Sequence, residues 1–87
     1  WLLPLRRWAG GRSKAAAESI SRADALRASK PDRAIELYER ALRDAPEELE
    51  ALWKLATLLD ERKLADRAAG TYRRVLSLAH YLGVAED

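Results

Sequence analysis

The chain has 87 residues, of which 48% are hydrophobic and 34% charged, a balance typical of one small folded domain. It has no cysteine and one histidine, which excludes disulfides, cysteine-based metal sites and thiol chemistry. No phosphate-binding glycine loop, nucleophile with its base, or supported carboxylate pair is present. We therefore expect a protein that is not an enzyme and that has no cofactor and no metal site.

The net charge of +2 is distributed unevenly. Residues 1–14 contain basic residues and no acid, and they carry +4, which leaves residues 15–87 with a net charge of −2. The residues Gly10 and Gly11 mark the change in composition, so we predict a basic, apolar leader over residues 1–14 followed by a helical body.

Three interpretations of this leader stay open. It is the end of a membrane anchor followed by positive residues, the remainder of an organelle-targeting segment, or a packing segment in which Trp1, Leu5 and Trp8 cover an end of the body. The first interpretation predicts the cytoplasm or the cytoplasmic face of a membrane, and the second predicts mitochondria.

The body is predicted to form four helices, over residues 14–28, 33–44, 47–61 and 65–82. The residues Ser29 to Asp32 separate the first two helices, because Pro31 suits an opening turn. The dipeptide Ala45-Pro46 ends the second helix, and Gly83 ends the fourth.

Apolar residues recur in these helices at the spacing i, i+3 or i+4, and i+7, and no alternation with a period of two is present. The three stripes are Ala34, Tyr38, Ala41 and Leu42; Leu52, Leu55, Ala56 and Leu59; and Ala68, Tyr72, Val75 and Leu76. The third stripe follows the first at a constant offset of 34 residues. The sequence therefore predicts an all-α fold in which a helical hairpin is repeated.

The 34-residue period and the order of residue types resemble the tetratricopeptide repeat, with its pattern W-x2-L-G-x2-Y, then A-x3-F, then P. The second half follows this pattern with Leu52, Leu55, Ala56, Leu59, Ala68 and Tyr72, and has His80 in place of the proline. The first half matches at Ala34, Tyr38 and Pro46 but has Glu18, Ser21, Arg22 and Ala25 at the four places of its leading helix. We expect repeat 1 over residues 15–48, repeat 2 over residues 49–82 and a tail over residues 83–87.

The resemblance implies antiparallel helix-turn-helix pairs stacked as a short right-handed solenoid, whose leading helices line a concave groove. In this family the groove usually binds an extended peptide or a helix of another protein. Carried over by position, the groove-facing residues are Ser19, Arg22, Ala23, Glu50, Trp53, Lys54, Thr57 and Asp60. The carboxylate clamp of some members, built from Lys, Arg and Asn, is not expected because the chain has no Asn.

Trp53 has two interpretations. It lies one residue after Leu52, about 100° around the helix from the core stripe. An exposed Trp there is an effective anchor for a partner, because it adds apolar area with few rotatable bonds. Alternatively, Trp53 packs on the leader or on the first helix of its own chain.

Our first functional hypothesis is thus an adaptor that binds another protein. The alternative is a structural helical subunit of a larger, membrane-associated complex, and self-association is a third way to cover the open end of a two-repeat stack. A nucleic-acid or anionic-lipid site over Arg62, Lys63, Arg67, Arg73 and Arg74 is disfavoured, because acidic residues are interleaved and no aromatic platform accompanies them.

Overall fold

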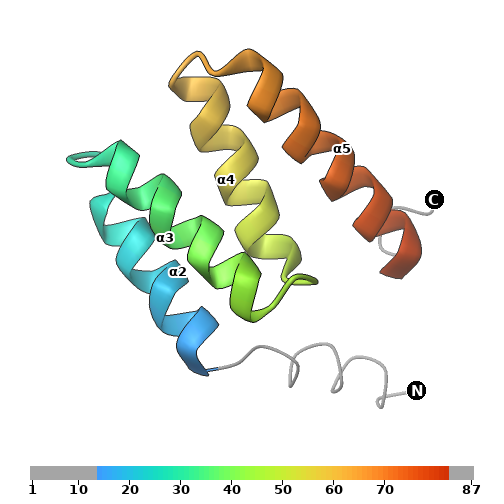
Figure 1. The fold of residues 1–87 in the computed structure, drawn as a ribbon, viewed down its shortest axis with the longest axis horizontal. Helices are drawn as coiled ribbons and strands as arrows, with labels where there is room; N and C mark the ends of the chain where they lie inside the picture. Colours follow the sequence, from blue (N-terminus) through green and yellow to red (C-terminus); the bar gives the residue numbers. More distant parts are fainter. Residues whose placement is uncertain (1–13, 83–87) are drawn as a thin grey trace.

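A computed structural model describes residues 14–82, which form four α-helices joined by short turns. The helices are α2 (Lys14–Leu26), α3 (Pro31–Asp44), α4 (Leu49–Glu61) and α5 (Ala65–Leu82), shown in Figure 1. The all-α prediction is confirmed, and the helix bounds differ from the predicted ones by two residues at most. The predicted leader, apart from Lys14 at the start of α2, lies outside the described residues, as do Gly83 and the predicted tail.

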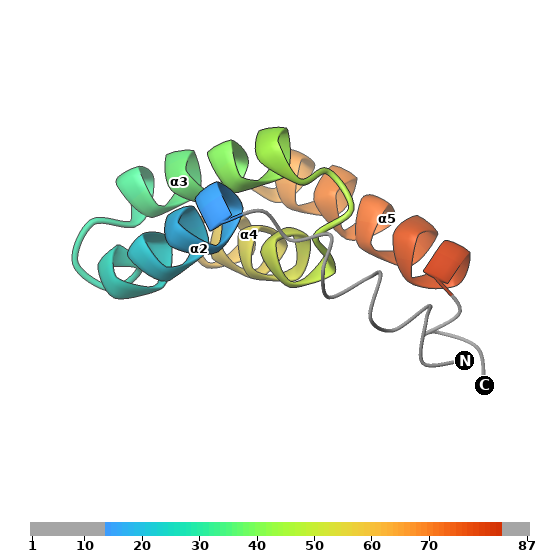
Figure 2. The same ribbon diagram turned by 90° about the horizontal axis from the view of Figure 1, so that it is seen from below.

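The helices form two antiparallel pairs that lie side by side. Helix α2 packs on α3, α4 packs on α5, and α3 joins the pairs by packing on α4. In the view of Figure 2, α3 lies above α2 and α4. No helix in residues 14–82 has both the length and the apolar composition needed to cross a bilayer.

The core is centred on α3, because this helix has neighbours on both sides. Ala34, Tyr38 and Ala41 are completely buried, and Leu37 is nearly so. Alanine at a contact lets two helix backbones approach closely, and Tyr38 fills the space beside these small residues. The stripe predicted for α3 is therefore the centre of the core.

The turn between α4 and α5 has a specific local geometry. Lys63 has a φ of 64°, which places it in the left-handed region. Its N–H donates to the carbonyl of Asp60 at 3.0 Å, and the N–H of Leu64 donates to the carbonyl of Leu59 at 2.9 Å. These two bonds form a Schellman motif, which satisfies carbonyls at the end of α4 and fixes the direction in which α5 starts.

The stripe of the first helix differs from the predicted one. The buried residues of α2 are Ala16, Ser19, Ile20 and Ala23. The four residues assigned to these places from the sequence, namely Glu18, Ser21, Arg22 and Ala25, are exposed. That assignment was wrong by two residues.

The cause is a longer stretch of chain between the stripe of α2 and the stripe of α3. Eighteen residues separate Ala16 from Ala34, whereas sixteen separate the equivalent Leu52 from Ala68. The offset of 34 residues therefore holds between α3 and α5, but the offset between α2 and α4 is 36. A search of the sequence with a single fixed period of 34 residues does not detect these two additional residues.

Candidate partner-binding surface

Trp53 of α4 combines exposure with a fixed aromatic neighbour. It is 52% exposed. Its ring meets that of Tyr72 on α5 edge-on, with centroids 5.7 Å apart and an interplanar angle of 67°. Tyr72 is itself half-buried against the core. The edge-on contact restricts the indole while leaving about half of it open to solvent.

The other predicted residues of α4 lie near Trp53. Relative to Trp53, Glu50 lies at i−3, Thr57 at i+4 and Asp60 at i+7. All four residues are therefore on one side of the helix. Asp60 is exposed, whereas Glu50, Lys54 and Thr57 are half-buried. The structure thus brings the α4 part of the predicted groove onto one surface.

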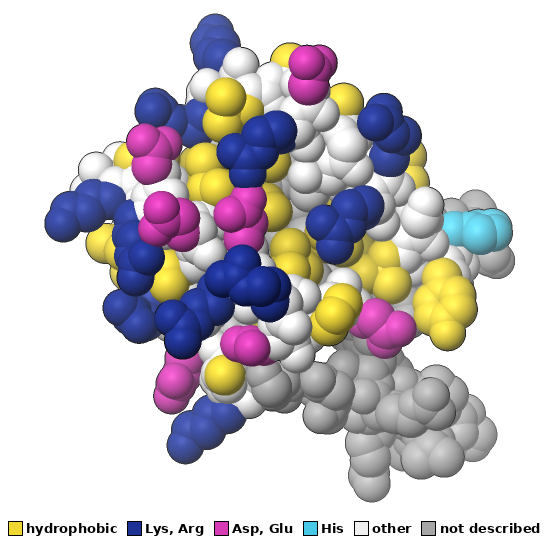
Figure 3. All heavy atoms as spheres, in the orientation of Figure 1, with side chains coloured by type: hydrophobic (Ala, Val, Ile, Leu, Met, Phe, Trp, Pro, Cys, Tyr) yellow, Lys and Arg dark blue, Asp and Glu magenta, His cyan; other side chains and the backbone are white. Residues whose placement is uncertain are grey.

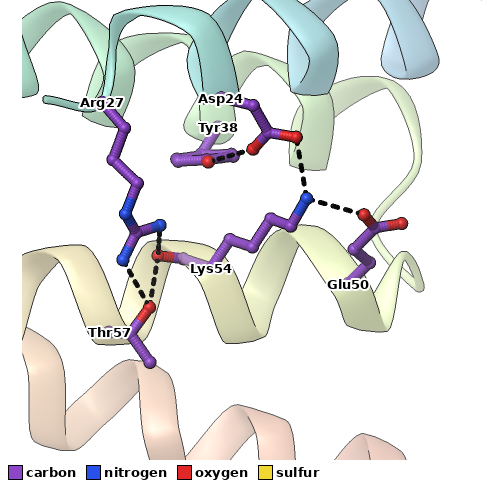
Figure 4. Close-up of polar contacts among 6 residues, drawn as sticks. All are labelled: Asp24, Arg27, Tyr38, Glu50, Lys54 and Thr57. Atoms are coloured by element: carbon purple, nitrogen blue, oxygen red, sulfur yellow. Dashed lines mark hydrogen bonds and ion pairs between the residues drawn. The ribbon is translucent and has the colours of Figure 1, made fainter.

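A polar network joins α2, α3 and α4 beside this surface (Figure 4). The Asp24 carboxylate accepts a hydrogen bond from the Tyr38 hydroxyl and another from Lys54 Nζ, the latter at 2.8 Å. Lys54 Nζ also lies 2.7 Å from a carboxylate oxygen of Glu50. The ammonium group of Lys54 is therefore held between two carboxylates.

Arg27, in the turn after α2, extends this network along α4. Its guanidinium donates to the Lys54 carbonyl at 3.0 Å and to Thr57 Oγ1 at 2.7 Å. Thr57 Oγ1 in turn donates to the Lys54 carbonyl at 3.0 Å. The Arg27 guanidinium also lies 6.0 Å from the centre of the Tyr38 ring. We call Asp24, Arg27, Tyr38, Glu50, Lys54 and Thr57 the inter-repeat network.

The network shifts two protonation equilibria. Burial alone lowers the pKa of Lys54, but hydrogen bonding and attraction from Asp24 and Glu50 outweigh it and raise that pKa above its usual 10.5. Burial raises the pKa of the Tyr38 hydroxyl above 10.0, and the hydrogen bond to Asp24 adds to this, while Arg27 opposes it. Lys54 is thus a cation near neutral pH that is already paired within the chain.

Two residues predicted to face the groove do not reach the surface. Ser19 is 7% exposed and Ala23 is completely buried, because both belong to the core stripe of α2. Arg22 is exposed, as predicted. The error has the same cause as the misplaced stripe, namely the two-residue difference between the hairpins.

The comparison with known families decides the assignment. A family model described as Tetratricopeptide repeat matches residues 23–81, which is more than half of the chain. The chain belongs to the tetratricopeptide repeat family. No curated protein and no solved structure matches it. Tetratricopeptide repeat domains are in general protein–protein interaction modules and are typically not catalytic. Among the described residues, no group of His, Asp and Glu is arranged to hold a metal ion.

The tetratricopeptide repeat match starts at residue 23, near the end of α2, and the stripe of this helix differs from the family pattern. Its buried stripe consists of Ala16, Ser19, Ile20 and Ala23, which depart from the bulky residues of the family pattern. Helix α2 is nevertheless packed as the leading helix of the first repeat.

Sequence reasoning missed two residues of the inter-repeat network, Asp24 and Arg27. With the offset of 36 residues, Asp24 occupies the place that Asp60 has in α4, so the corrected register would have indicated it. With the same offset, Ala17 and Ser21 of α2 occupy the places that Trp53 and Thr57 have in α4. No sequence signal identifies Arg27, because it donates to a backbone carbonyl and a hydroxyl across 27 and 30 residues.

Proposed function

We propose that this tetratricopeptide repeat domain binds a peptide or a helix of another protein on the surface formed by α2 and α4, with Trp53 as the anchor. The proposal rests on the observation that the indole of Trp53 is half exposed and contacts the ring of Tyr72 edge-on. Aromatic side chains that are ordered before binding lose little entropy on binding and dominate many interfaces.

The surroundings of Trp53 define the rest of the proposed site. Thr57 and Asp60 continue the surface along α4, and Ser21 and Arg22 provide exposed polar groups on α2. Lys54 and Glu50 support the site through the inter-repeat network, because their charges already face each other. We therefore assign recognition to the indole and the exposed polar groups, and positioning to the network.

The test is selection of binding peptides against the full chain, followed by affinity measurements with variants. Trp53→Ala is expected to weaken a selected peptide by at least about tenfold. Leu76→Ala is the matched control, since it removes an exposed apolar side chain from another helix and leaves Trp53 in place. Circular dichroism of both variants should match the wild type.

Two results would contradict this proposal. Unchanged peptide affinity in Trp53→Ala would remove the indole from the site. A large loss of helicity in the same variant would make Trp53 a structural residue that covers Tyr72 within the chain.

A second candidate function is that of a helical subunit within a larger assembly. Leu76 is 66% exposed and Tyr81 is 76% exposed on α5, the last described helix of the stack. Size-exclusion chromatography with light scattering separates the two functions. A 9.8 kDa monomer favours the adaptor, whereas a dimer that Leu76→Glu dissociates favours assembly through α5. The predicted location, including the membrane-associated alternative, stays a prediction from residues 1–14.

A further inference from the structure

A second surface, formed by α3 and α5 above α4, is hollowed along its length. Two hollows of about 470 and 500 Å3 lie there and share Gly70 and Arg74 in their linings. We call the pair the α3–α5 trough. The residues of α5 that line it are Arg67, Gly70, Thr71, Arg73, Arg74, Ser77 and Leu78, and all of them except Arg73, which lies beside the others, share one helix face. The trough thus follows about three turns of α5.

The bottom of the trough is apolar. Leu42 of α3 and Leu52, Leu55 and Leu59 of α4 line it from below and are buried. Gly70 lies in both hollows, and a Cβ at this position would have room, since it would meet only a guanidinium nitrogen of Arg73, at 4.0 Å. Because these leucines are at most 7% exposed, they close the floor of the trough and present only a narrow apolar surface to a ligand.

The rims of the trough are basic. Arg43, Arg67, Arg73 and Arg74 line it together with one acid, Glu39. Arg67 is paired with Glu39, whereas the other three arginines are exposed and make no ion pair with any residue in the described part of the chain. On the face seen in Figure 3, hydrophobic side chains lie between Lys and Arg side chains.

We propose that the α3–α5 trough binds an amphipathic helix of another protein, with aliphatic residues on its inner face and Asp or Glu along both flanks. Leucines at the bottom accept the aliphatic side chains, and the three unpaired arginines on the rims pair with the flanking carboxylates. This surface is separate from the Trp53 site, because Trp53 does not line it.

The residues that line the trough favour an acidic protein helix over nucleic acid and over an anionic lipid surface. None of the described residues that line the trough is aromatic, so nucleic-acid bases have no platform on which to stack. The leucines lie recessed between two helices, where a helix can insert side chains but a flat lipid surface cannot reach. An acidic amphipathic helix satisfies both the recessed bottom and the basic rims.

The experiment uses the full chain and a labelled synthetic peptide of about 18 residues, long enough to form a helix. The peptide carries leucines at i, i+3, i+4 and i+7 and glutamates on its flanks, and the comparison peptide has lysines in place of the glutamates. Fluorescence anisotropy should show binding of the acidic peptide, weakening as salt is raised, and at least about tenfold weaker binding of the lysine peptide.

Variants locate the binding. Gly70→Trp, which fills the trough, and the double variant Arg43→Gln/Arg74→Gln should each weaken the acidic peptide by about tenfold or more. Gly70→Ala and Trp53→Ala should each leave the affinity for the acidic peptide within about twofold. Gly70→Ala adds a methyl group for which there is room, and Trp53 does not line the trough. Both arginines are exposed, so the double variant is expected to fold even if Gly70→Trp does not.

Several results would overturn the proposal. These are equal binding of the two peptides, loss of binding in Trp53→Ala, and unchanged binding in the double arginine variant. Binding of phosphatidylserine vesicles or duplex RNA that requires Arg43 and Arg74, without binding of the acidic peptide, would also overturn it and assign the basic rims to another partner.

Discussion

Leu42 and Leu76 occupy equivalent places on α3 and α5, 34 residues apart, yet Leu42 is 7% exposed and Leu76 is 66% exposed. Tyr38 and Tyr72 show the same contrast, since the first is completely buried and the second only half-buried. Both α2 and α4 pack on α3, the helix that carries the first member of each pair. Within the described residues, no following helix covers the second.

This contrast predicts different costs for the same substitution. Leu42→Ala should lower the free energy of unfolding by about 2–4 kcal/mol, because it leaves a cavity in the core. Leu76→Ala should change it by less than about 0.5 kcal/mol in the monomer. Urea denaturation followed by circular dichroism measures both. A large loss in Leu76→Ala that depends on protein concentration would instead show that a second copy covers α5.

The inter-repeat network predicts a role for Arg27 in holding the two hairpins together. Arg27→Ala should lower the free energy of unfolding by about 1–2 kcal/mol, because the hydrogen bonds to the Lys54 carbonyl and Thr57 are lost from a half-buried site, together with the exposed contact to Glu61. Arg33→Ala is the matched control. It breaks the exposed pair with Glu36 and should cost less than about 0.5 kcal/mol. Equal costs for the two variants would show that the network adds nothing beyond a surface ion pair.

Much of the fold could be predicted from the sequence, because the signals of α3, α4 and α5 are local and strong. Ala34, Tyr38 and Ala41 have helical spacing and are buried, and Ala68, Tyr72 and Val75 follow them at an offset of 34 residues. Helix α2 gave a weaker signal, since its stripe contains alanine and serine. Its register depends on a turn length that spacing alone does not determine.

The candidate site was less predictable for a physical reason. The position of Trp53 follows from the α4 stripe, and its exposure of 52% agrees with one of the two interpretations left open by the sequence. The contacts of Lys54 and Thr57 depend on Asp24 and Arg27, which lie 30 residues earlier, on and just after the helix whose stripe was misassigned. The α3–α5 trough requires the packing of three helices, so no single stripe indicates it.

The Schellman turn after α4 predicts a stabilising substitution. Lys63 adopts a φ of 64°, where a Cβ is unfavourable and glycine is not. Lys63→Gly should therefore raise the free energy of unfolding by about 1 kcal/mol. Lys63→Ala keeps the Cβ and should remain close to the wild type. The urea midpoints of the three proteins provide the measurement. A loss of stability in Lys63→Gly would show that the left-handed backbone of Lys63 does not destabilise the fold.

Alkaline pH should destabilise the fold through Tyr38 and Lys54. Both groups have a pKa above their usual values of 10.0 and 10.5, so the folded state holds its protons more tightly than the unfolded state. Their contribution is complete below about pH 10 and is lost as the pH rises through the folded-state pKa values. The free energy of unfolding should therefore fall above about pH 10.

The substitution Tyr38→Phe separates the tyrosine from the lysine. It removes the ionisable hydroxyl, so the fall in stability above about pH 10 should become shallower, even if the variant is less stable at neutral pH. Tyr81→Phe is the control, because Tyr81 is 76% exposed and should leave the profile of the wild type unchanged. Urea denaturation across this pH range measures the slopes. A slope in Tyr38→Phe equal to that of the wild type would show that the buried hydroxyl does not contribute to the alkaline transition.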